Sequence, residues 1–384
     1  MSSSLRFWVT SAVSVALLLG LLIWGLLQWN LTNYSQMVGD RLMLLVELRR
    51  GAIEEYLDTA QAELRFWSTN KEMLDAQVSL LELWEQPSVA EQVRHAYVEA
   101  NPNPPGFYIN LDDAEDGSAY SEFHARMHPQ ARLFVSERGY YDFFLIGPAG
   151  DVLYSVEKEP DFTTNLVGGP WSDTLLAQVF KEAKRIPKGR VAISDLHRYE
   201  PSKGAPAMFI GTALYSSEDE FLGVIAFQLP TDHILGIMNY TSGMGQTGET
   251  YLVGSDKLMR SDSRFSEEST VLQQVVDTPT VELALAGEQG QALVADYRGI
   301  EVLSAYLPML VGDSRWAVMA EIDRQEIVQG AAGERPNFSG ALLFVYGLSL
   351  WSVWYWRSRQ LPGEGDQMAM MEFSESADGG GLEG

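Results

Sequence analysis

Residues 139–166 read GYYDFFLIGPAGDVLYSVEKEPDFTTNL, and this stretch decides the fold class. An aromatic and aliphatic run, Tyr140 to Ile146, is followed by a Gly-Pro-Ala-Gly turn and a second apolar run from Val152 to Val156. Two β-prone runs joined through proline and glycine predict a hairpin. A polar loop, a helix-like stretch and further strand-like runs follow, as expected for one α/β module.

A related pattern recurs about 100 residues later, which indicates an internal repeat. Its two runs are Thr250–Gly254 and Leu258–Ser261. The two copies end alike, in the apolar runs Phe221–Phe227 and Arg315–Glu321, each followed by a short link and a helix that begins near Ile234 or Ile327. The sequence therefore predicts an α/β (α+β) fold with two tandem modules.

Two stretches also resemble a known family. His124–Leu166, with HARMHP, GYYDFFL, DVLYSVEKE and DFTTNL, and Thr247–Phe265, TGETYLVGSDKLMRSDSRF, are similar to the periplasmic double Cache sensor family. The resemblance covers most of residues 34–330. It implies two PAS-like modules outside the cell on one long helix between two membrane spans, as in the input halves of bacterial chemoreceptors, histidine kinases and nucleotide cyclases.

Composition excludes several classes of function. A formal net charge of −25 on 384 residues argues against a nucleic-acid partner, which needs a basic surface, and against adhesion to anionic lipid. The absence of cysteine excludes disulfides, thiol nucleophiles and thiolate metal sites. No G-x-S-x-G, P-loop or H-E-x-x-H motif is present, so no enzymatic activity and no cofactor are expected.

Two weaker motifs have structural explanations. Residues 243–248 spell G-x-G-x-x-G, but a helix precedes them and a strand follows, the reverse of a nucleotide-binding turn. We expect a joint between the modules. His124 and His128 lie one turn apart with Glu122 nearby, but zinc needs a third or fourth ligand. We expect these histidines to tie their helix to a module, and we predict no metal site.

Apolar runs near both ends predict membrane spans. Phe7–Trp29 and Phe338–Trp356 each suit the roughly 20 helical residues that a bilayer core requires. Interfacial aromatics and Arg357 and Arg359 follow the second run, and Arg6 precedes the first, so both ends are expected in the cytoplasm. The predicted segments are 1–6 (cytoplasmic), 7–29 (span), 30–138 (long helix and helical region), 139–240 (distal module), 247–330 (proximal module), 338–356 (span) and 357–384 (disordered tail).

A long helix explains the order of the modules. Asn33 to Trp84 contains no proline, and apolar residues recur at helical spacing at Ile53, Leu57, Ala60, Leu64 and Trp67. Fifty helical residues reach about 75 Å, enough to carry the chain to a membrane-distal first module. The apolar stripe either forms a homodimer or packs on the modules, and the pattern leaves both open. A further helix is expected from Ser118 to Glu137.

The distal module is the predicted ligand site, under a cover formed by residues 161–184. Aromatic walls and a few fixed polar groups are typical of such sites. The candidate ligand contacts are Lys158, Asn165, Trp171, Asp195, Tyr199, Phe209 and Gln228. The amino-acid-binding branch of the family uses Arg-x-Trp-Tyr in the cover and two acids on far strands. Here Gly169, Trp171 and Ser172 fill the motif, and the carboxylate-binding arginine is missing.

The function that follows is a membrane-anchored extracytoplasmic sensor of a small molecule in signal transduction. The acidic tail after Arg359 cannot hold a kinase, cyclase or relay module, so we expect a membrane partner to carry the signal. The alternatives are the input half of a longer or decayed receptor, and a structural module that binds protein. The ligand's identity does not follow from the sequence.

Overall fold

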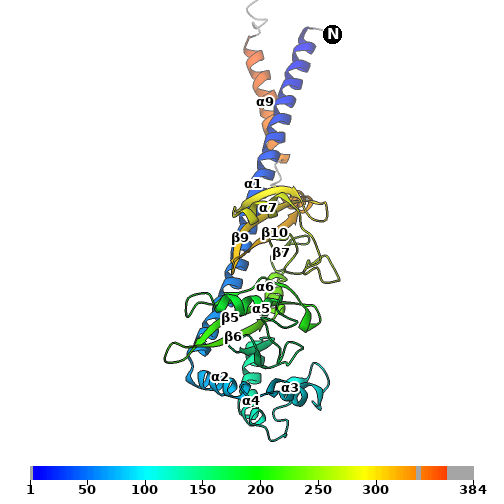
Figure 1. The fold of residues 1–384 in the computed structure, drawn as a ribbon. Coiled ribbons are helices and arrows are strands. Elements are labelled where there is room, and N and C mark those ends of the chain that lie inside the picture. The colour runs from blue at the N-terminus through cyan, green and yellow to red at the C-terminus, as the bar shows by residue number, and fades with distance from the viewer. Residues whose placement is uncertain (1–2, 334–338, 361–384) are drawn as a thin grey trace, which may run out of the picture. The chain divides into compact units, whose positions relative to one another are not determined.

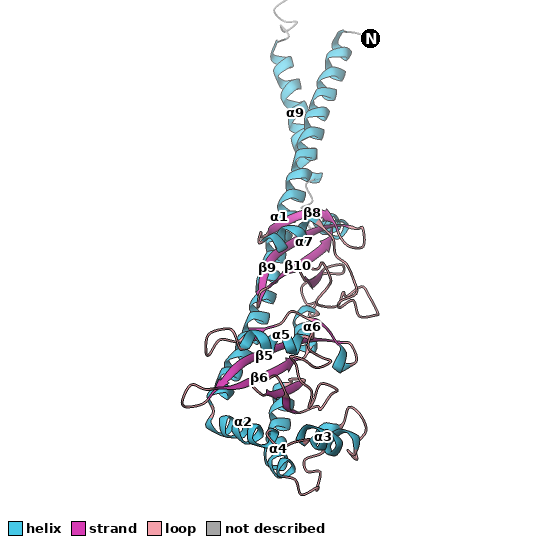
Figure 2. Cartoon of the chain, in the orientation of Figure 1, coloured by secondary structure: helices cyan, strands magenta, loops and turns pink. Residues whose placement is uncertain are grey.

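The computed structural model describes residues 3–333 and 339–360. Chain contacts divide these into a unit of residues 38–326 and a second unit formed by the two ends. The helices are α1 Ser3–Thr69, α2 Lys71–Trp84, α3 Val89–Arg94, α4 Ala119–Arg138, α5 Leu175–Ala183, α6 Thr231–Met238, α7 Pro279–Ala286, α8 Arg324–Gly333 and α9 Ser339–Gln360 (Figures 1 and 2). Short helical turns cover His95–Glu99, Tyr108–Asn110 and Glu200–Ser202.

The strands form two antiparallel sheets inside the unit of residues 38–326. The strands are β1 Asp142–Ile146, β2 Val152–Ser155, β3 Ala192–Ile193, β4 His197–Tyr199, β5 Ala205–Tyr215, β6 Phe221–Leu229, β7 Glu249–Val253, β8 Gly290–Ala295, β9 Glu301–Val311 and β10 Ser314–Asp323. The first sheet has the order β2-β1-β6-β5-β3, with β4 on β5, and the second has the order β7-β10-β9-β8. The predicted α/β class with two tandem modules is confirmed.

The first hairpin forms as predicted. β1 pairs with β2 in antiparallel register, and β1 also pairs with β6, which places it inside the sheet. Its neighbour β6 begins with Phe221, Leu222 and Gly223. The glycine is required there because its φ is +132° and an added Cβ would lie 2.0 Å from the carbonyl oxygen of Ile146.

The second hairpin is only half formed. β7 is a full strand, but the expected second run, Leu258–Ser261, contributes isolated bridges at Leu258 and Met259 rather than a strand. Arg260 of this run forms a buried ion pair, described below. The closing runs behave as expected and form β6 and β10.

The long helix is interrupted once. α1 ends at Thr69, and Asn70 caps α2 by accepting the backbone N–H of Met73, so the expected continuous helix to Trp84 is wrong at this point. The predicted apolar stripe is buried within the single chain: Ile53, Leu57, Ala60 and Leu64 are at most 4% exposed. For this stripe, packing on the chain's own modules is therefore confirmed.

α1 contacts both modules at successive points along its length. Asp40 accepts a hydrogen bond from Gln291 of β8, in the second sheet. Further along the helix, Tyr56 stacks on His233 of α6 with ring centroids 4.3 Å apart. Glu63 accepts the Tyr140 hydroxyl at 2.7 Å, just before β1. The helix thus meets the second module first and the first module last.

One described helix is long and apolar enough to cross a membrane. It runs from Val9 to Thr69, and its most apolar window has a mean hydropathy of 2.2. Many large apolar side chains of its first part are exposed, and four of them are more than half exposed: Leu17, Leu18, Leu21 and Trp24. The second predicted span, Phe338–Trp356, lies in the described helix α9 except for Phe338. The expected tail, residues 357–384, is outside the described residues from residue 361 onward, and both expectations stay predictions.

The two histidines of α4 tie this helix to the preceding loop. Their rings stack 4.3 Å apart and are buried. His124 bonds the Asp112 carbonyl at 2.7 Å, and His128 bonds the Ile109 carbonyl and the Tyr154 hydroxyl. Burial lowers the pKa of His128 to about 3, helped by the charge of Lys158. Both rings are neutral at physiological pH and serve the structural role that we expected.

Candidate functional site

One row of residues crosses the first sheet on a single face. Asp142 of β1 lies opposite Gln228 of β6, and Gln228 lies opposite Phe209 of β5. Directly paired residues point to the same face, so the three side chains stand together. α5 covers this face, because Val179 of α5 packs where a Cβ on Gly211 of β5 would lie.

Asp142 is fully buried, and only one of its two carboxylate oxygens has hydrogen-bond partners among the described residues. Its Oδ1 accepts the backbone N–H groups of Phe143 at 2.6 Å and Val156 at 2.7 Å. Its Oδ2 has no hydrogen-bond partner among the described residues. Burial raises the pKa of Asp142 well above its ordinary value, and the nearby charges of Glu157 and Asp161 raise it further. A carboxylate in this position gains from a bound cation or donor.

A second acid joins the row from the cover. Asp161 is fully buried, and its Oδ2 accepts the Tyr199 hydroxyl at 2.5 Å, while its Oδ1 has no partner among the described residues. Burial raises the pKa of Asp161 to about 7, against the opposing effect of the Tyr199 hydrogen bond. The Tyr199 ring packs edge-on against Phe209 with centroids 4.7 Å apart. Asp161 is thereby linked to the sheet row.

Gln228 completes the set of free acceptors. Its Nε2 donates to Ser202 at 3.2 Å, and Ser202 in turn donates to Glu159 at 2.5 Å. Its Oε1 has no partner among the described residues, although the side chain is only 3% exposed. Asp142 Oδ2, Asp161 Oδ1 and Gln228 Oε1 are thus three buried acceptors without donors. Such orphans are rare in folded proteins and each calls for a ligand, water or ion.

Three of the seven predicted contacts lie in this cluster, namely Tyr199, Phe209 and Gln228. Lys158 is also fully buried, three residues beyond the end of β2, where the charge of Asp142 acts on it. Its Nζ donates to the Val156 carbonyl and stands over the rings of Tyr97 and Tyr154, at 5.9 and 5.8 Å. Burial lowers the pKa of Lys158 to about 7. Its contact with a ligand stays a prediction.

Asn165 and Trp171 hold the cover together. Asn165 donates to Ala149 and Asp151 and accepts the N–H groups of Val167 and Gly168. Trp171 donates to the Pro160 carbonyl at 3.2 Å, next to Asp161. These hydrogen bonds stabilise the cover. Contact of either residue with a ligand stays a prediction.

The backbone around Gly169 leaves no space for the arginine of the amino-acid-binding motif. A Cβ on Gly169 would lie 2.3 Å from the Asn165 carbonyl oxygen. No side chain fits at that position without moving the backbone, so an arginine cannot be carried there as the loop stands.

Asp195 is the clearest departure from the predicted site. Both of its oxygens bind Arg260, at 3.2 and 3.1 Å, and its Oδ1 also accepts the indole N–H of Trp316 at 2.8 Å. Arg260 and Trp316 belong to the second module. Burial raises the pKa of Asp195, but the hydrogen bonds and charge of Arg260 outweigh it and the net pKa is lowered. Asp195 joins the two modules instead of facing the row of acceptors.

Sequence reasoning missed Asp142 and Asp161. A signal for Asp142 was present, since it is the one charged residue in the strand run Tyr140–Ile146. An acid at a buried position of a strand is rare unless it is paired. Asp161 carried no such signal, because acids are ordinary in a polar loop.

The predicted joint, residues 243–248, is held by an acid of α8. Glu326 accepts the backbone N–H groups of Gln246 and Thr247, at 2.9 and 2.8 Å, and the Thr247 hydroxyl. The amides that would bind a phosphate in a nucleotide-binding loop are occupied by this carboxylate. The interpretation as a joint between modules is consistent with this arrangement.

The fold and the buried clusters can be compared with known proteins. A family model described as "Cache domain", of the double Cache type, matches residues 36–331, most of the chain. The chain belongs to the Cache domain family. Cache sensor domains bind ligands and, in chemoreceptors, lie outside the cytoplasm. No curated protein matches the chain.

Several solved Cache sensor structures are similar to this chain in fold. The sensory domain of the Campylobacter jejuni chemoreceptor Tlp3 has 10% identity and a TM-score of 0.48, over 79% of this chain and 99% of that one. The ligand-binding domain of the Pseudomonas aeruginosa chemoreceptor PctB, in complex with L-Arg, has 11% identity and a TM-score of 0.44, over 76% and 97%. That of Pseudomonas fluorescens CtaA, with L-serine, has 13% identity and a TM-score of 0.41, over 78% and 99%.

Proposed function

We propose that this Cache protein is a membrane-anchored, extracytoplasmic and non-enzymatic sensor whose first module binds a small organic cation. The observation that carries the proposal is the set of three buried acceptors without donors, Asp142 Oδ2, Asp161 Oδ1 and Gln228 Oε1. A ligand that offers N–H donors and a positive charge satisfies all three. Burying such groups unpaired is costly, which makes a matching ligand favourable.

The chemistry of the cluster favours an ammonium over a carboxylate. Burial raises the pKa of Asp142 and Asp161, and a bound cation would draw both into the charged carboxylate form. The rings of Tyr199 and Phe209 pack edge-on nearby. Aromatic faces attract cations, by about 0.5–2 kcal/mol depending on desolvation. The tight backbone at Gly169 leaves no arginine there to bind a carboxylate. An amine without a carboxylate therefore fits this site better than an ordinary amino acid.

Binding would be transmitted through α1. Glu63 of this helix holds the first module through the Tyr140 hydroxyl and, at 3.0 Å, through Arg138. A ligand shifts this packing only if it binds one of two arrangements more tightly than the other. The exposed apolar start of α1 supports a membrane anchor, and a second span near α9 would complete a two-pass topology. Reporter fusions near Gly243 should then be extracytoplasmic.

A homodimer is part of the proposal. Leu44 and Leu48 lie one turn apart on α1 and are 55% and 60% exposed, away from the buried stripe. Apolar side chains at this spacing suit a helix–helix contact between two copies. A membrane partner that reads the helix movement is also expected, and the second span would be its contact surface.

The test is a thermal-shift series on the full chain in detergent. Putrescine, agmatine, ethanolamine and choline should include a compound that raises the unfolding midpoint, and neutral polyols of the same size should not. Asp142→Asn keeps the Oδ1 acceptor for the backbone and removes the charge, so it should fold and lose the response. Asp173→Asn, at an exposed position in the same cover, is the matched control.

Three results would count against the proposal. Stabilisation by carboxylates alone would show that the site binds anions. A response to amines that persists in both Asp142→Asn and Asp161→Asn would place the ligand elsewhere. Failure of every small molecule, together with capture of a defined protein partner by the first module, would favour the protein-binding alternative.

A further inference from the structure

The second module repeats the buried row of the first with more charge. Glu249 of β7 lies opposite Glu321 of β10, and Glu321 lies opposite Ser304 of β9. These positions correspond to Asp142 and Gln228 in the row of the first sheet. An acid again stands at the first residue of the opening strand, but here its neighbour is a second acid. All three side chains are buried.

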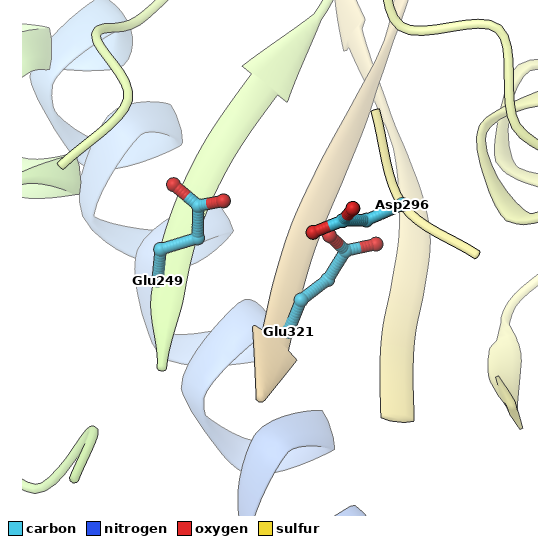
Figure 3. Close-up of side chains that lie close together, drawn as sticks. All are labelled: Glu249, Asp296 and Glu321. Carbon is cyan, nitrogen blue, oxygen red and sulfur yellow. The ribbon is translucent and has the colours of Figure 1, made fainter. Parts of the chain in front are cut away.

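A third acid reaches the same place from the end of β8. Asp296 follows this strand and is 5% exposed. Oxygen atoms of Glu249, Asp296 and Glu321, one from each, all lie within 4.8 Å of one another. Figure 3 shows Asp296 and Glu321 with their carboxylates against one another and Glu249 on the adjacent strand. Three carboxylates this close repel each other strongly unless a cation or protons neutralise them.

Two of the acids are held by the protein. Glu249 accepts the Tyr297 hydroxyl at 2.8 Å and the Ser263 hydroxyl at 3.1 Å. Asp296 accepts the backbone N–H groups of Arg298 and Ile300 and the Arg298 guanidinium. These contacts orient both carboxylates. Both oxygens of Glu249 and Oδ2 of Asp296 each accept one hydrogen bond and keep a further lone pair, whereas Oδ1 of Asp296 already accepts two. Preoriented carboxylates of this kind are typical of metal ligands.

The third acid is not held at all. Glu321 is 1% exposed, and neither of its oxygens has a hydrogen-bond partner among the described residues. Burial raises the pKa of Glu321 to about 7, against the opposing effect of the nearby Ser304 and Tyr251 hydroxyls. The Tyr251 hydroxyl is itself buried and without a partner among the described residues. A fully buried carboxylate and a fully buried hydroxyl are therefore aimed into the cluster with no protein group to bind.

The charges around the cluster do not balance. Arg298 brings one positive charge, and it is shared with Asp323 through a bond of 2.9 Å. Arg264 of the same module donates a guanidinium N–H to the Gly248 carbonyl. Three buried carboxylates thus face one shared guanidinium, which leaves room for about two more positive charges.

We propose that the second module of this Cache protein carries a divalent-cation site, with Ca²⁺ as the preferred ion and Glu249, Asp296 and Glu321 as ligands. Ca²⁺ prefers carboxylate oxygens at about 2.3–2.6 Å, so two ligands on opposite sides of it lie about 4.6–5.2 Å apart. The observed spread of the oxygens fits inside that span. Mg²⁺, at about 2.1 Å and with strict octahedral demands, would require the cluster to contract.

The ion would connect elements that are far apart in sequence. It would join the first residue of β7, the end of strand β10 and the loop after β8. β10 passes directly into α8. Bound Ca²⁺ would therefore stiffen the end of the second sheet that leads into this helix. The site is independent of the organic-cation site proposed in the first module.

The test uses the full chain in detergent after dialysis against EDTA. Addition of CaCl₂ should raise the unfolding midpoint of the wild type, with a weaker effect of MgCl₂. Tb³⁺, which replaces Ca²⁺, should show sensitised luminescence because Tyr251 and Tyr297 border the cluster. Glu321→Gln preserves shape and should lower the Ca²⁺ affinity at least tenfold while leaving the EDTA-treated protein folded. Glu267→Gln, at an exposed position of the same module, is the matched control.

Three results would overturn the site. They are no Ca²⁺-dependent shift in the wild type up to millimolar CaCl₂, an equal shift in Glu321→Gln, or a shift caused by putrescine but not by Ca²⁺ that requires Glu321. Asp161→Asn should leave the Ca²⁺ response intact. Failure of the first-module proposal would therefore show in the amine series alone, and failure of this one in the Ca²⁺ series alone.

Discussion

Asp195 provides a decisive mutation because sequence and structure assign it different roles. Its side chain is 10% exposed and that of Arg260 is fully buried, and two N–H···O bonds join them. Removing one partner from a buried ion pair usually costs about 3–5 kcal/mol, since the other charge stays buried. Arg260 retains Asp256 at 2.9 Å and the Leu258 carbonyl, which places the loss at the lower end.

We therefore expect Asp195→Ala to lower the free energy of unfolding by about 3 kcal/mol, with about 1 kcal/mol more from the lost Trp316 hydrogen bond. Chemical denaturation followed by tryptophan fluorescence measures this directly. The control is Asp219→Ala, which removes an exposed pair with Lys188 and should change stability by about 1 kcal/mol or less. Both variants should keep the amine response of the first module.

The pH dependence gives a second readout for the same pair. The pKa of Asp195 is lowered in the folded state, so its contribution to stability is present above the unfolded value near 3.8 and is lost as the pH falls below it. A loss below 1 kcal/mol in Asp195→Ala would refute the assignment of this pair as the main link between the modules. Loss of the amine response with unchanged stability would restore Asp195 to the ligand site.

Three further predictions concern other parts of the chain. The pKa values of Asp161 and Glu321 are raised to about 7 in the folded state. Without ligands, the free energy of unfolding should therefore fall as the pH rises from about 4 to 7. In Asp161→Asn, the thermal unfolding midpoint should depend less on pH between pH 5.5 and 7.5. Gly223→Ala should lower stability by about 2–4 kcal/mol by urea denaturation, because its Cβ would collide with Ile146, whereas Gly236→Ala in α6 has open space and should be nearly neutral. Leu48→Cys should form a disulfide-linked dimer on mild oxidation if α1 mediates dimerisation, since the chain has no other cysteine; the buried Leu57→Cys should not.

The sequence was sufficient for the fold because its local signals agree. The aromatic run Tyr140–Ile146, its turn and its later repeat each favour strands by themselves, and the apolar stripe of α1 requires a partner surface. The prediction failed in two places. Asn70 caps a new helix in a stretch without proline. The run Leu258–Ser261 forms only isolated bridges, and its Arg260 pairs with a buried acid of the other module.

The sites depend on pairings that no local pattern contains. Tyr199, Phe209 and Gln228 were predictable as aromatic or polar residues on strands that face a cover. Asp195 looked equivalent to them, and only the tertiary structure shows its side chain turned toward Arg260 and Trp316. The polar character of a residue is a property of the sequence, but the atom that satisfies it lies more than sixty positions away.

The sequence by itself determined the class of the protein: two repeated α/β modules, a long helix, apolar ends and no catalytic motif. The tertiary structure alone decided which acids lie close together and which of them lack hydrogen-bond partners. Glu249, Asp296 and Glu321 lie in three separate segments, and strand register brings their oxygens together. Hydrogen-bond satisfaction is a property of three-dimensional neighbours, and for that reason binding sites made of orphaned groups appear only once the chain is folded.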